Sequence, residues 1–266
     1  MTGFIGGGNM AEALIKGIVQ SSRFKVKSEI IVSEPREERR GYLEKTYGVK
    51  TTNSNKDIAS SCNIIILAVK PQIMGQVLEE IKSSVTDDKT VVSIAAGITL
   101  SYLQSKLNTK KLIRVMPNTP ALVHEGMSVM SLCECFSDKD INPVREIFMS
   151  VGKVLTLPEK YMNAVTALSG SGPAFIAFFI EAMIEGGVKS GLSKENASEL
   201  AIQTLLGTAS LLETGMPPEK LREMVTSPGG TTAAGLKVFE EKELRDTVLS
   251  AIDSAVKRAE ELGRKE

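Results

Sequence analysis

The residues near the start of the chain that are best suited to chemistry form a glycine-rich turn between a strand and a helix. The short apolar segment Thr2–Ile5 runs into Gly6-Gly7-Gly8-Asn9-Met10-Ala11, and apolar residues at helical spacing follow it. Gly6 permits a tight turn, Gly8 lets the backbone approach a pyrophosphate, and the small Ala11 lets the helix pack on the strand. The helix N-terminus presents free N–H groups to the phosphates. Residues 6–10 therefore predict a dinucleotide site, with an ordinary strand-to-helix turn as the alternative.

The end of the second expected strand, Ile30–Ser33, would read the adenosine ribose of such a dinucleotide. Glu34 follows Gly8 at slightly more than the ~20 residues usual for an acid that binds a ribose 2′-hydroxyl, which favours NAD. Ser33 and Arg36 favour NADP instead, because they could hold a 2′-phosphate. We expect Arg39 and Arg40 to lie on a solvated helical turn. These residues leave the choice between NADPH and NADH open.

Two further expected strands end at the sheet edge where open α/β sheets bind ligands. The run Ile64–Val69 leads through Ala68 and Val69 into Lys70-Pro71, and the run Thr90–Ala95 leads into Ala96-Gly97. Lys70 would meet a phosphate or the nicotinamide, although it could instead simply cover apolar surface with its methylene chain. The small residues Ala95, Ala96 and Gly97 would let a nicotinamide ring lie flat on the backbone.

The second half of the chain contains a separate loop rich in hydroxyl groups and glycine, Thr226-Ser227-Pro228-Gly229-Gly230-Thr231-Thr232. The two glycines expose backbone N–H groups, hydroxyls surround them, and a helix N-terminus follows. This combination suits a small carboxylate. A plain helical hairpin with a capping hydroxyl is the alternative, and the residues alone do not decide between the two.

The elements that position these residues differ between the two halves. Expected strands are Thr2–Ile5, Ile30–Ser33, Ile64–Val69, Thr90–Ala95, Leu112–Met116, Met127–Leu132 and Lys153–Leu157, with helices at Met10–Gln20, Arg36–Thr46, Ile73–Lys82, Ser101–Lys106 and Asp140–Met149. The nearly continuous apolar run Ile64–Val69 is typical of a strand covered on both faces. Residues 1–157 are therefore expected to form an α/β domain with a doubly wound, Rossmann-type sheet.

Residues 158–266 are expected to form an all-helical domain. Its helices are Ala174–Lys189, Lys194–Leu212, Pro218–Val225, Thr232–Glu240 and Glu243–Leu262, and the glycines and proline of Leu168–Pro173 predict a kink before the first. The helix from Ala174 is apolar on most of its circumference. The other helices of this half can hardly cover it, so we expect an intertwined homodimer, with packing against the sheet as the alternative.

Composition excludes several function classes. The 32 basic and 32 acidic residues balance, so no net charge favours nucleic acid or an anionic membrane. The start of the chain does not resemble a secretory signal, and the apolar stretch Phe175–Ile180 is too short to span a bilayer. His124 is the single histidine, and Cys62, Cys133 and Cys135 form no framework. We therefore expect reduced thiols, no metal and a cytoplasmic protein.

These motifs resemble the pyrroline-5-carboxylate reductase family over essentially the whole chain. Besides the glycine turn, the matching blocks are Ala68–Pro71, Met116–Pro120, Ala167–Ala174 and Val225–Thr232. The resemblance implies reduction of 1-pyrroline-5-carboxylate to L-proline by NADPH or NADH, the last step of proline biosynthesis. It also implies a homodimer through the helical half, and leaves open a ring of dimers such as a decamer.

The resemblance further assigns residues to the substrate. The substrate would sit between the dinucleotide domain and the loop Ser227–Thr232, with Thr232 on the ring nitrogen. The carboxylate would be held by Ser227, Gly229, Gly230 and Thr231. Asn55 would lie near the adenosine ribose, and Glu159 would border the substrate. Because Glu34 stands where many relatives accept a 2′-phosphate more readily, the usual NADPH preference stays open.

The implied reaction, hydride transfer to a cyclic imine, agrees with the absence of an obvious catalytic acid or base among the motif residues. A protonated cyclic imine already carries its proton, so hydride transfer needs positioning rather than a strong acid, and Lys70 is expected to position. A β-hydroxyacid dehydrogenase is disfavoured, because enzymes of that class typically have a lysine and an asparagine together on the helix between their domains. Here the only lysine between Pro173 and Gly191 is Lys189, near the end of the expected helix. A reductase of six-membered imines and an NAD(P)-sensing protein without turnover are the remaining alternatives.

Overall fold

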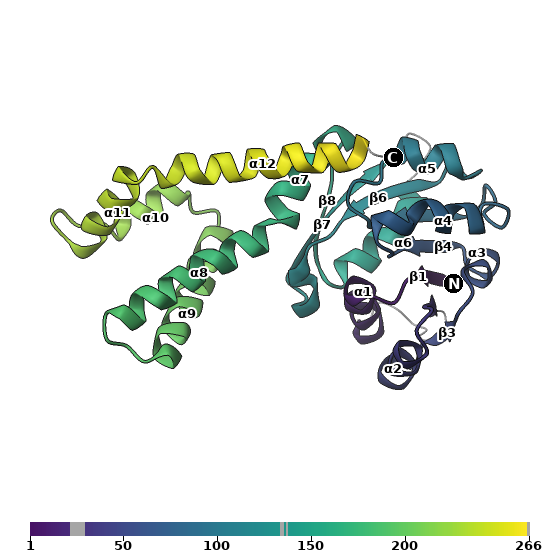
Figure 1. Ribbon diagram of the computed structural model, residues 1–266, viewed down its shortest axis with the longest axis horizontal. Coiled ribbons are helices and arrows are strands. Elements are labelled where there is room, and N and C mark those ends of the chain that lie inside the picture. The colour runs from purple at the N-terminus through teal and green to yellow at the C-terminus, as the bar shows by residue number, and fades with distance from the viewer. Residues whose placement is uncertain (22–29, 134–135, 137, 265–266) are drawn as a thin grey trace. The chain divides into compact units, whose positions relative to one another are not determined.

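Short aliphatic runs in the first half of the chain form the strands of one sheet (Figure 1). These are β1 (Thr2–Ile5), β2 (Ile30–Ser33), β3 (Lys50–Thr52), β4 (Ile64–Leu67), β5 (Thr90–Ser93), β6 (Leu112–Met116), β7 (Gly126–Leu132) and β8 (Gly152–Thr156). Their order is β3-β2-β1-β4-β5-β6-β7-β8. The first six strands are parallel, β7 runs antiparallel to β6, and β8 runs parallel to β7. The doubly wound order of the first six strands confirms the expected fold class.

Helices cover both faces of this sheet, because alternate residues of each strand point to opposite sides. One core joins Phe4 and Ile66 to α1 (Asn9–Gln20), α2 (Glu37–Tyr47) and α6 (Asp138–Met149). The other joins Ile5 and Leu67 to α3 (Asn55–Ser61), α4 (Pro71–Ile81) and α5 (Leu100–Lys106). Ile65, Ile66 and Leu67 are fully buried, as expected for a strand covered on both faces. Each such side chain contributes roughly 1.5–3 kcal/mol to folding.

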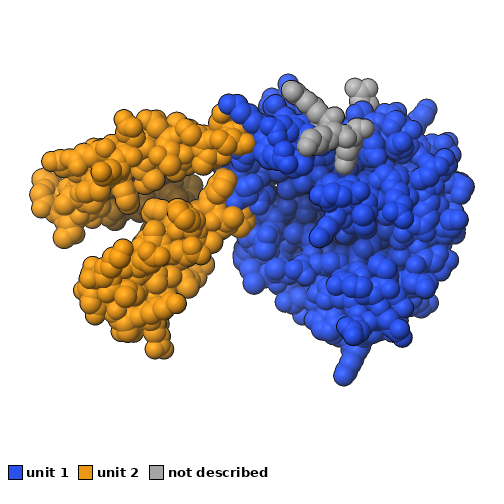
Figure 2. Space-filling model, in the orientation of Figure 1, with its two compact units in different colours: residues 1–171, 255–266 blue, residues 172–254 orange. Residues whose placement is uncertain are grey.

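The structure, a computed structural model, describes residues 1–21, 30–133, 136 and 138–264. Packing divides the chain into two compact units: unit 1 is Met1–Ser171 with Ala255–Glu266, and unit 2 is Gly172–Ser254 (Figure 2). The boundary predicted at residues 157 and 158 differs from this division, because the segment after β8 and the last turns of the C-terminal helix pack in unit 1. As a division into functional domains, that boundary stays a prediction.

The segment after β8 is helical but irregular. It comprises η3 (Glu159–Tyr161), α7 (Met162–Val165) and the π-helical turn η4 (Thr166–Gly170). The N–H of Ser171 donates to the carbonyl of Thr166 at 2.9 Å, the five-residue spacing of a π turn. The irregularity expected between Leu168 and Pro173 is therefore present. Another short helix, η2 (Thr119–Val123), links β6 to β7 in the same unit.

Unit 2 is entirely helical in its regular structure, as expected for this half. It contains α8 (Gly172–Lys189), α9 (Lys194–Glu213), α10 (Pro218–Met224), α11 (Thr231–Glu241) and the first part of α12 (Leu244–Arg264). Ser193 begins α9 by accepting a hydrogen bond from the N–H of Asn196, and Pro218 opens α10. Helices α8 and α9 pack together, yet no residue of α8 is buried.

The apolar surface of α8 is therefore largely exposed in a single copy of the chain. Phe178 is 75% exposed, and Phe175, Ile176, Phe179 and Met183 are exposed as well. Within the helical stretch Glu159–Lys189, an 18-residue segment has a mean hydropathy of 1.5, so by length and composition alone this stretch could cross a membrane. The shorter run Phe175–Ile180 had not indicated this, because the consecutive helical turns from η3 to α8 extend well beyond it. Length and composition alone do not distinguish such a span from a helix buried in a protein interface.

Candidate functional site

The glycine turn between β1 and α1 has the geometry that close approach of a ligand requires. Gly6 has a φ of +99°, and a Cβ placed on it would lie 2.7 Å from the carbonyl oxygen of Ala68. A Cβ on Gly8, in contrast, would meet nothing within 4 Å. Gly8 is also the N-cap of α1 without a side-chain capping bond. The turn thus fits a pyrophosphate, because it offers open space beside uncapped helix amides.

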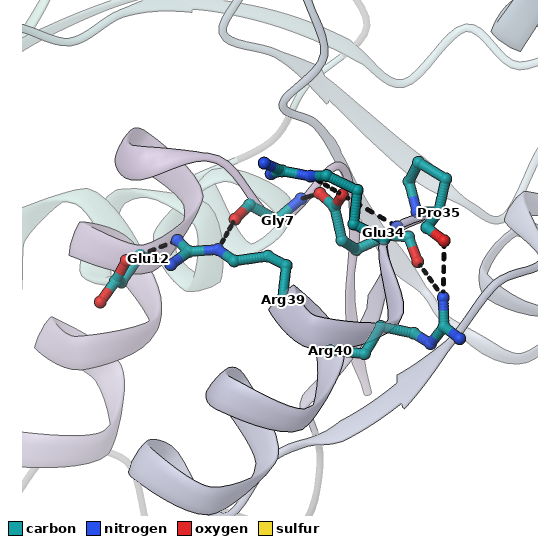
Figure 3. A network of polar contacts seen from close by, with 7 residues as sticks. Gly7, Glu12, Glu34, Pro35, Arg39 and Arg40 are labelled. Carbon is teal, nitrogen blue, oxygen red and sulfur yellow. Dashed lines mark hydrogen bonds and ion pairs between the residues drawn. The ribbon is translucent and has the colours of Figure 1, made fainter.

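Glu34, just after β2, is joined to this turn (Figure 3). Its Oε2 atom accepts a hydrogen bond from the N–H of Gly7 at 3.0 Å. Its Oε1 atom accepts from the backbone N–H of Arg36 at 3.2 Å and from Arg36 Nε at 2.8 Å. The residue is only 5% exposed. Burial by itself raises the pKa of Glu34, but the bonds from Arg36 and Gly7 outweigh it, so the pKa lies below its ordinary value.

Arg39 and Arg40 belong to the same network, and the expectation that they lie on a solvated turn is wrong. Arg39 Nε donates to the carbonyl of Gly7 at 2.7 Å, and its Nη2 pairs with Glu12 of α1. Arg40 Nη1 donates to the carbonyls of Glu34 and Pro35 at 2.8 and 2.9 Å. The two side chains therefore brace the turn and the chain after β2 against α2 (Figure 3).

Ser33 and Asn55 also come together at this edge, although they come from different elements. The Ser33 hydroxyl donates to Asn55 Oδ1 at 2.7 Å, and Asn55 Nδ2 donates to Glu80 of α4 at 2.8 Å. Asn55 is the first residue of α3, which Ser54 caps by accepting from the N–H of Asp57. The structure thus brings Gly7, Ser33, Glu34 and Asn55 to one edge of the sheet.

The segment after β4 lies beside the glycine turn. The N–H of Ala68 donates to the carbonyl of Ile5 at 2.8 Å, and the Ala68 carbonyl borders Gly6. Val69 is close to Gly6 as well. Lys70 is exposed and precedes Pro71, the first residue of α4. These positions suit contact with a dinucleotide held by the turn.

The segment after β5 packs against the end of α12 (Leu244–Arg264), a contact that the sequence did not predict. Ala95 and Gly97 are buried, and Ala96 lies between them. Gly97 has a φ of +83°, and a Cβ placed on it would lie 3.3 Å from the Cβ of Leu262 in α12. Gly97 therefore needs to be glycine because the end of α12 lies against it. This contact is within unit 1.

Glu159 and Arg114 form an ion pair at the edge of a polar cavity of about 480 Å³ in unit 1. Arg114 Nη1 donates to Glu159 Oε1 at 3.1 Å, and the N–H of Leu100 donates to the same oxygen at 2.8 Å. Arg114 is only 5% exposed, so the pair keeps a buried charge compensated. Sequence reasoning had not singled out Arg114, although it is the one charged residue in the apolar run Leu112–Met116.

Two of the motif blocks pack together at Asn118. Its Oδ1 accepts from the N–H of Met127 at 2.8 Å, and its Nδ2 donates to the hydroxyl of Ser169 at 3.2 Å. A Cβ on Gly170 would lie 2.7 Å from Met116 Cε. The block Met116–Pro120 therefore holds the π-helical turn in place, and this explains why both blocks have small or polar residues here.

The hydroxyl-rich loop of unit 2 precedes α11. Gly229 has a φ of +71°, and the N–H of Gly230 donates to the carbonyl of Ser227 at 3.0 Å. Gly230 is the N-cap of α11 without a side-chain capping bond, so the amides of Thr231 and Thr232 begin the helix uncapped. Ser227, Gly229 and Thr231 are exposed in a single copy. This geometry suits a carboxylate at the helix N-terminus.

In the part of the chain that the structure describes, the remaining reactive side chains, Cys62, Cys133 and His124, are not arranged as a site. Burial raises the pKa of the Cys62 thiol, which opposes reactivity. Cys133 is partly buried, and Cys135 lies outside the described residues. His124 makes a contact of 3.1 Å between Nδ1 and the carbonyl of Ser150. Within the described ranges, no group of three or more His, Cys, Asp or Glu side chains is arranged to hold a metal.

Comparisons with known proteins cover nearly the whole chain. A family model described as pyrroline-5-carboxylate reductase dimerisation matches residues 159–262. A second, described as NADP oxidoreductase coenzyme F420-dependent, matches residues 1–97. The pyrroline-5-carboxylate reductase of Synechocystis sp. is 42% identical over 99% of this chain and 98% of its own.

Solved structures give the same result. Pyrroline carboxylate reductase from Plasmodium falciparum, solved with NADP bound, is 34% identical with a TM-score of 0.89, covering 98% of this chain and 97% of its own. The pyrroline-5-carboxylate reductase of Coxiella burnetii is 36% identical with a TM-score of 0.90 at the same coverage. With this identity along nearly its entire length, the chain belongs to the pyrroline-5-carboxylate reductase family.

Proposed function

We propose that this chain reduces 1-pyrroline-5-carboxylate to L-proline, with NADPH or NADH as the hydride donor. One observation carries the proposal: a dinucleotide-type glycine turn and the loop Ser227–Thr232 occur in order in a chain that is 42% identical to a pyrroline-5-carboxylate reductase over 99% of its length. The first feature suits a dinucleotide and the second suits a small carboxylate. Together they fit a reductase with a carboxylated substrate.

The dinucleotide is proposed to bind along the sheet edge of unit 1. When bound, it supplies the hydride. The residues proposed to hold it are Gly6, Gly7, Gly8, Asn9 and Met10 for the pyrophosphate, Ser33, Glu34, Arg36 and Asn55 around the adenosine ribose, and Ala68, Val69, Lys70, Pro71, Ala95, Ala96 and Gly97 towards the nicotinamide. The open space at Gly8 and the bond between Ser33 and Asn55 support this assignment.

The loop before α11 is proposed to hold the substrate. Ser227, Gly229, Gly230 and Thr231 would bind the carboxylate through hydroxyl and amide groups, and the Thr232 hydroxyl would bind the ring nitrogen. Because the iminium form of the substrate already carries its proton, the residues need only orient it and exclude water. Glu159 is proposed to act indirectly, since its carboxylate holds Arg114 and the first amide of α5.

A second copy of the chain is proposed to cover the exposed apolar face of α8. The dimerisation family model spans this helix, and a bare surface with Phe178 three-quarters exposed is typical of an obligate interface. In a homodimer the apolar surface of Glu159–Lys189 is covered by protein, so it does not require a membrane around it. We therefore propose a cytoplasmic location. Further assembly of dimers into a ring stays an open part of the proposal.

The activity is tested with purified protein, NADPH or NADH, and 1-pyrroline-5-carboxylate. We expect oxidation of the dinucleotide that depends on the imine and yields L-proline. The six-membered cyclic imine serves as the comparison, and we expect a lower kcat/KM for it. Tight binding of the dinucleotide without turnover of either imine would instead indicate a sensing protein and would rule out the proposed reaction.

A further inference from the structure

The loop after β5, residues 94–99, is held by hydrogen bonds at its two ends. At its start, a backbone hydrogen bond of 3.2 Å joins it to β4. At its end, the next backbone N–H, that of Leu100, donates to the carboxylate of Glu159 at 2.8 Å. Among the described residues, however, none accepts a hydrogen bond from the N–H of Ala96 or of Gly97. The middle of the loop is therefore fixed by packing.

This packing comes from the last turn of α12. A Cβ placed on Gly97 would lie 3.3 Å from the Cβ of Leu262. In return, a Cβ placed on Gly263 would lie 3.4 Å from the carbonyl oxygen of Gly97. Two glycines thus face each other, and the two backbones approach more closely than side chains would allow. Ala259, one turn earlier in α12, is only 6% exposed, so the same face of the helix is buried there.

Helix α12 connects this contact with the other half of the chain. Its 21 residues form one helix, of which the first part belongs to unit 2 and the part from Ala255 onwards to unit 1. Only Lys242 and Glu243 separate it from α11, the helix that follows the loop Ser227–Thr232. The helix that ends against the loop after β5 therefore begins close in sequence to the proposed substrate loop.

A fixed loop after β5 matters for hydride transfer more than for binding. Residues 95–97 are proposed to contact only the nicotinamide end of the dinucleotide, whereas the glycine turn and the end of β2 are proposed to hold the rest. Hydride transfer requires reacting atoms about 3–3.5 Å apart, and a misplacement of about 1 Å can cost a factor of about 100. Movement of this loop would therefore slow the transfer while most of the binding contacts stay in place.

We propose that the last turn of α12 is a latch that fixes the loop after β5, and that Leu262 and Gly263 are positioning residues for hydride transfer. The proposal rests on the proposed function and deepens it, because it names residues outside the binding site on which the reaction depends. Both residues act through Gly97. Position 263 has to be small, since the carbonyl oxygen of Gly97 is the first atom that a side chain there would meet.

Two pairs of variants test the latch, each matched in the kind of residue introduced. Gly263→Val pushes a branched side chain against the carbonyl of Gly97, and Leu262→Gly removes the Cβ that packs on Gly97. Glu261→Val and Glu261→Gly are the controls, because they put the same residues into the same turn at an exposed position paired with Arg258. Loss of such an exposed ion pair changes stability little. If one latch variant fails to fold, the other pair decides.

Hydrogen exchange measured by mass spectrometry on the free protein tests the latch without any reaction. We expect the peptide that covers residues 94–99 to exchange at least about threefold faster in both latch variants than in the wild type, because packing alone holds its middle. The two Glu261 variants should exchange as the wild type does. Unchanged exchange in the latch variants would overturn the proposal.

Single turnovers test the role in hydride transfer. Protein loaded with NADPH, or with NADH if that binds more tightly, is mixed with excess 1-pyrroline-5-carboxylate, and oxidation is followed by absorbance. We expect the latch variants to lower the rate constant about tenfold, with the amplitude unchanged and the dinucleotide dissociation constant within about threefold. A merely structural defect would lower the amplitude and leave the rate constant at the control value, and that result would overturn the proposal. A wild type without turnover would refute the proposed function instead, and exchange alone would then decide whether the latch exists.

Discussion

Substituting alanine at Gly6 and at Gly8 separates what the glycine turn does for folding from what it does for binding. At Gly6 an alanine takes a φ of +99° and brings its Cβ to 2.7 Å from the carbonyl oxygen of Ala68. The backbone strain costs about 1–2 kcal/mol, and the contact with a backbone atom adds to it because neither side yields easily. We expect Gly6→Ala to lower the free energy of unfolding by about 2–3 kcal/mol.

Gly8→Ala is the matched comparison. Gly8 has a φ of −71°, and its added Cβ meets nothing within 4 Å. Alanine is a poorer N-cap than glycine, but it also restricts the unfolded chain, so the two effects nearly cancel and stability should change by less than about 1 kcal/mol. The methyl group nevertheless occupies the space proposed for the pyrophosphate. We expect NADPH to bind at least tenfold more weakly, about 1.4 kcal/mol.

Both quantities are measurable on the same preparations. Urea unfolding followed by circular dichroism gives the free energy of unfolding, and NADPH fluorescence gives the dissociation constant. The reasoning is refuted if Gly8→Ala binds NADPH as tightly as the wild type, or if Gly6→Ala is as stable as the wild type. Either result would mean that the turn does not have the close contacts on which the dinucleotide site depends.

Three further variants test other parts of the structure. Thr232→Ala should lower kcat/KM for the imine at least tenfold while NADPH affinity stays within about twofold, and equal losses of both would show that Thr232 is misassigned. Phe178→Asp should shift the protein from dimer to monomer in size-exclusion chromatography with light scattering, and an unchanged dimer would exclude α8 from the interface. Burial raises the pKa of Glu12, but hydrogen bonds from Tyr47 and Arg39 outweigh it, so the pKa lies below its ordinary value. The ionised Glu12 therefore stabilises the folded state fully above about pH 4.5, and this contribution is lost as the pH falls through the lowered pKa. Glu12→Gln should therefore flatten the fall of Tm between about pH 5 and pH 3, whereas the exposed Glu37→Gln should not.

Most of the sheet and its helices could be predicted from the sequence because burial leaves a strong local pattern. The strand Ile64–Leu67 and the helix Asn9–Gln20 lie within two residues of their expected ranges. The strand Lys50–Thr52 and the helix Asn55–Ser61 were missed. The first has three polar residues at an edge of the sheet, and the second buries only Ile58 and Ala59. The cap between Ser54 and Asp57 was the signal that could have revealed the helix.

Contacts between segments that are distant along the chain could not be predicted from the sequence. Arg39 looks solvated on its own helix, and only the packing of α1 beside α2 brings it to Glu12. The need for glycine at position 97 comes from Leu262, which no local pattern connects with it. The role of Glu34 was open for the same reason: its residue type indicates a ribose-binding acid, but its partners Gly7 and Arg36 depend on the fold.

The proposed reaction is tested most directly by following the transferred hydrogen. The enzyme is supplied with NADPH carrying deuterium at C4 of the nicotinamide, on each face in turn, together with unlabelled 1-pyrroline-5-carboxylate. From one of the two labelled forms, we expect L-proline with a single deuterium on the ring carbon that was part of the C=N bond. Oxidation of NADPH without deuterium at that carbon in proline from either form, or no oxidation at all, would contradict the function proposed for this chain.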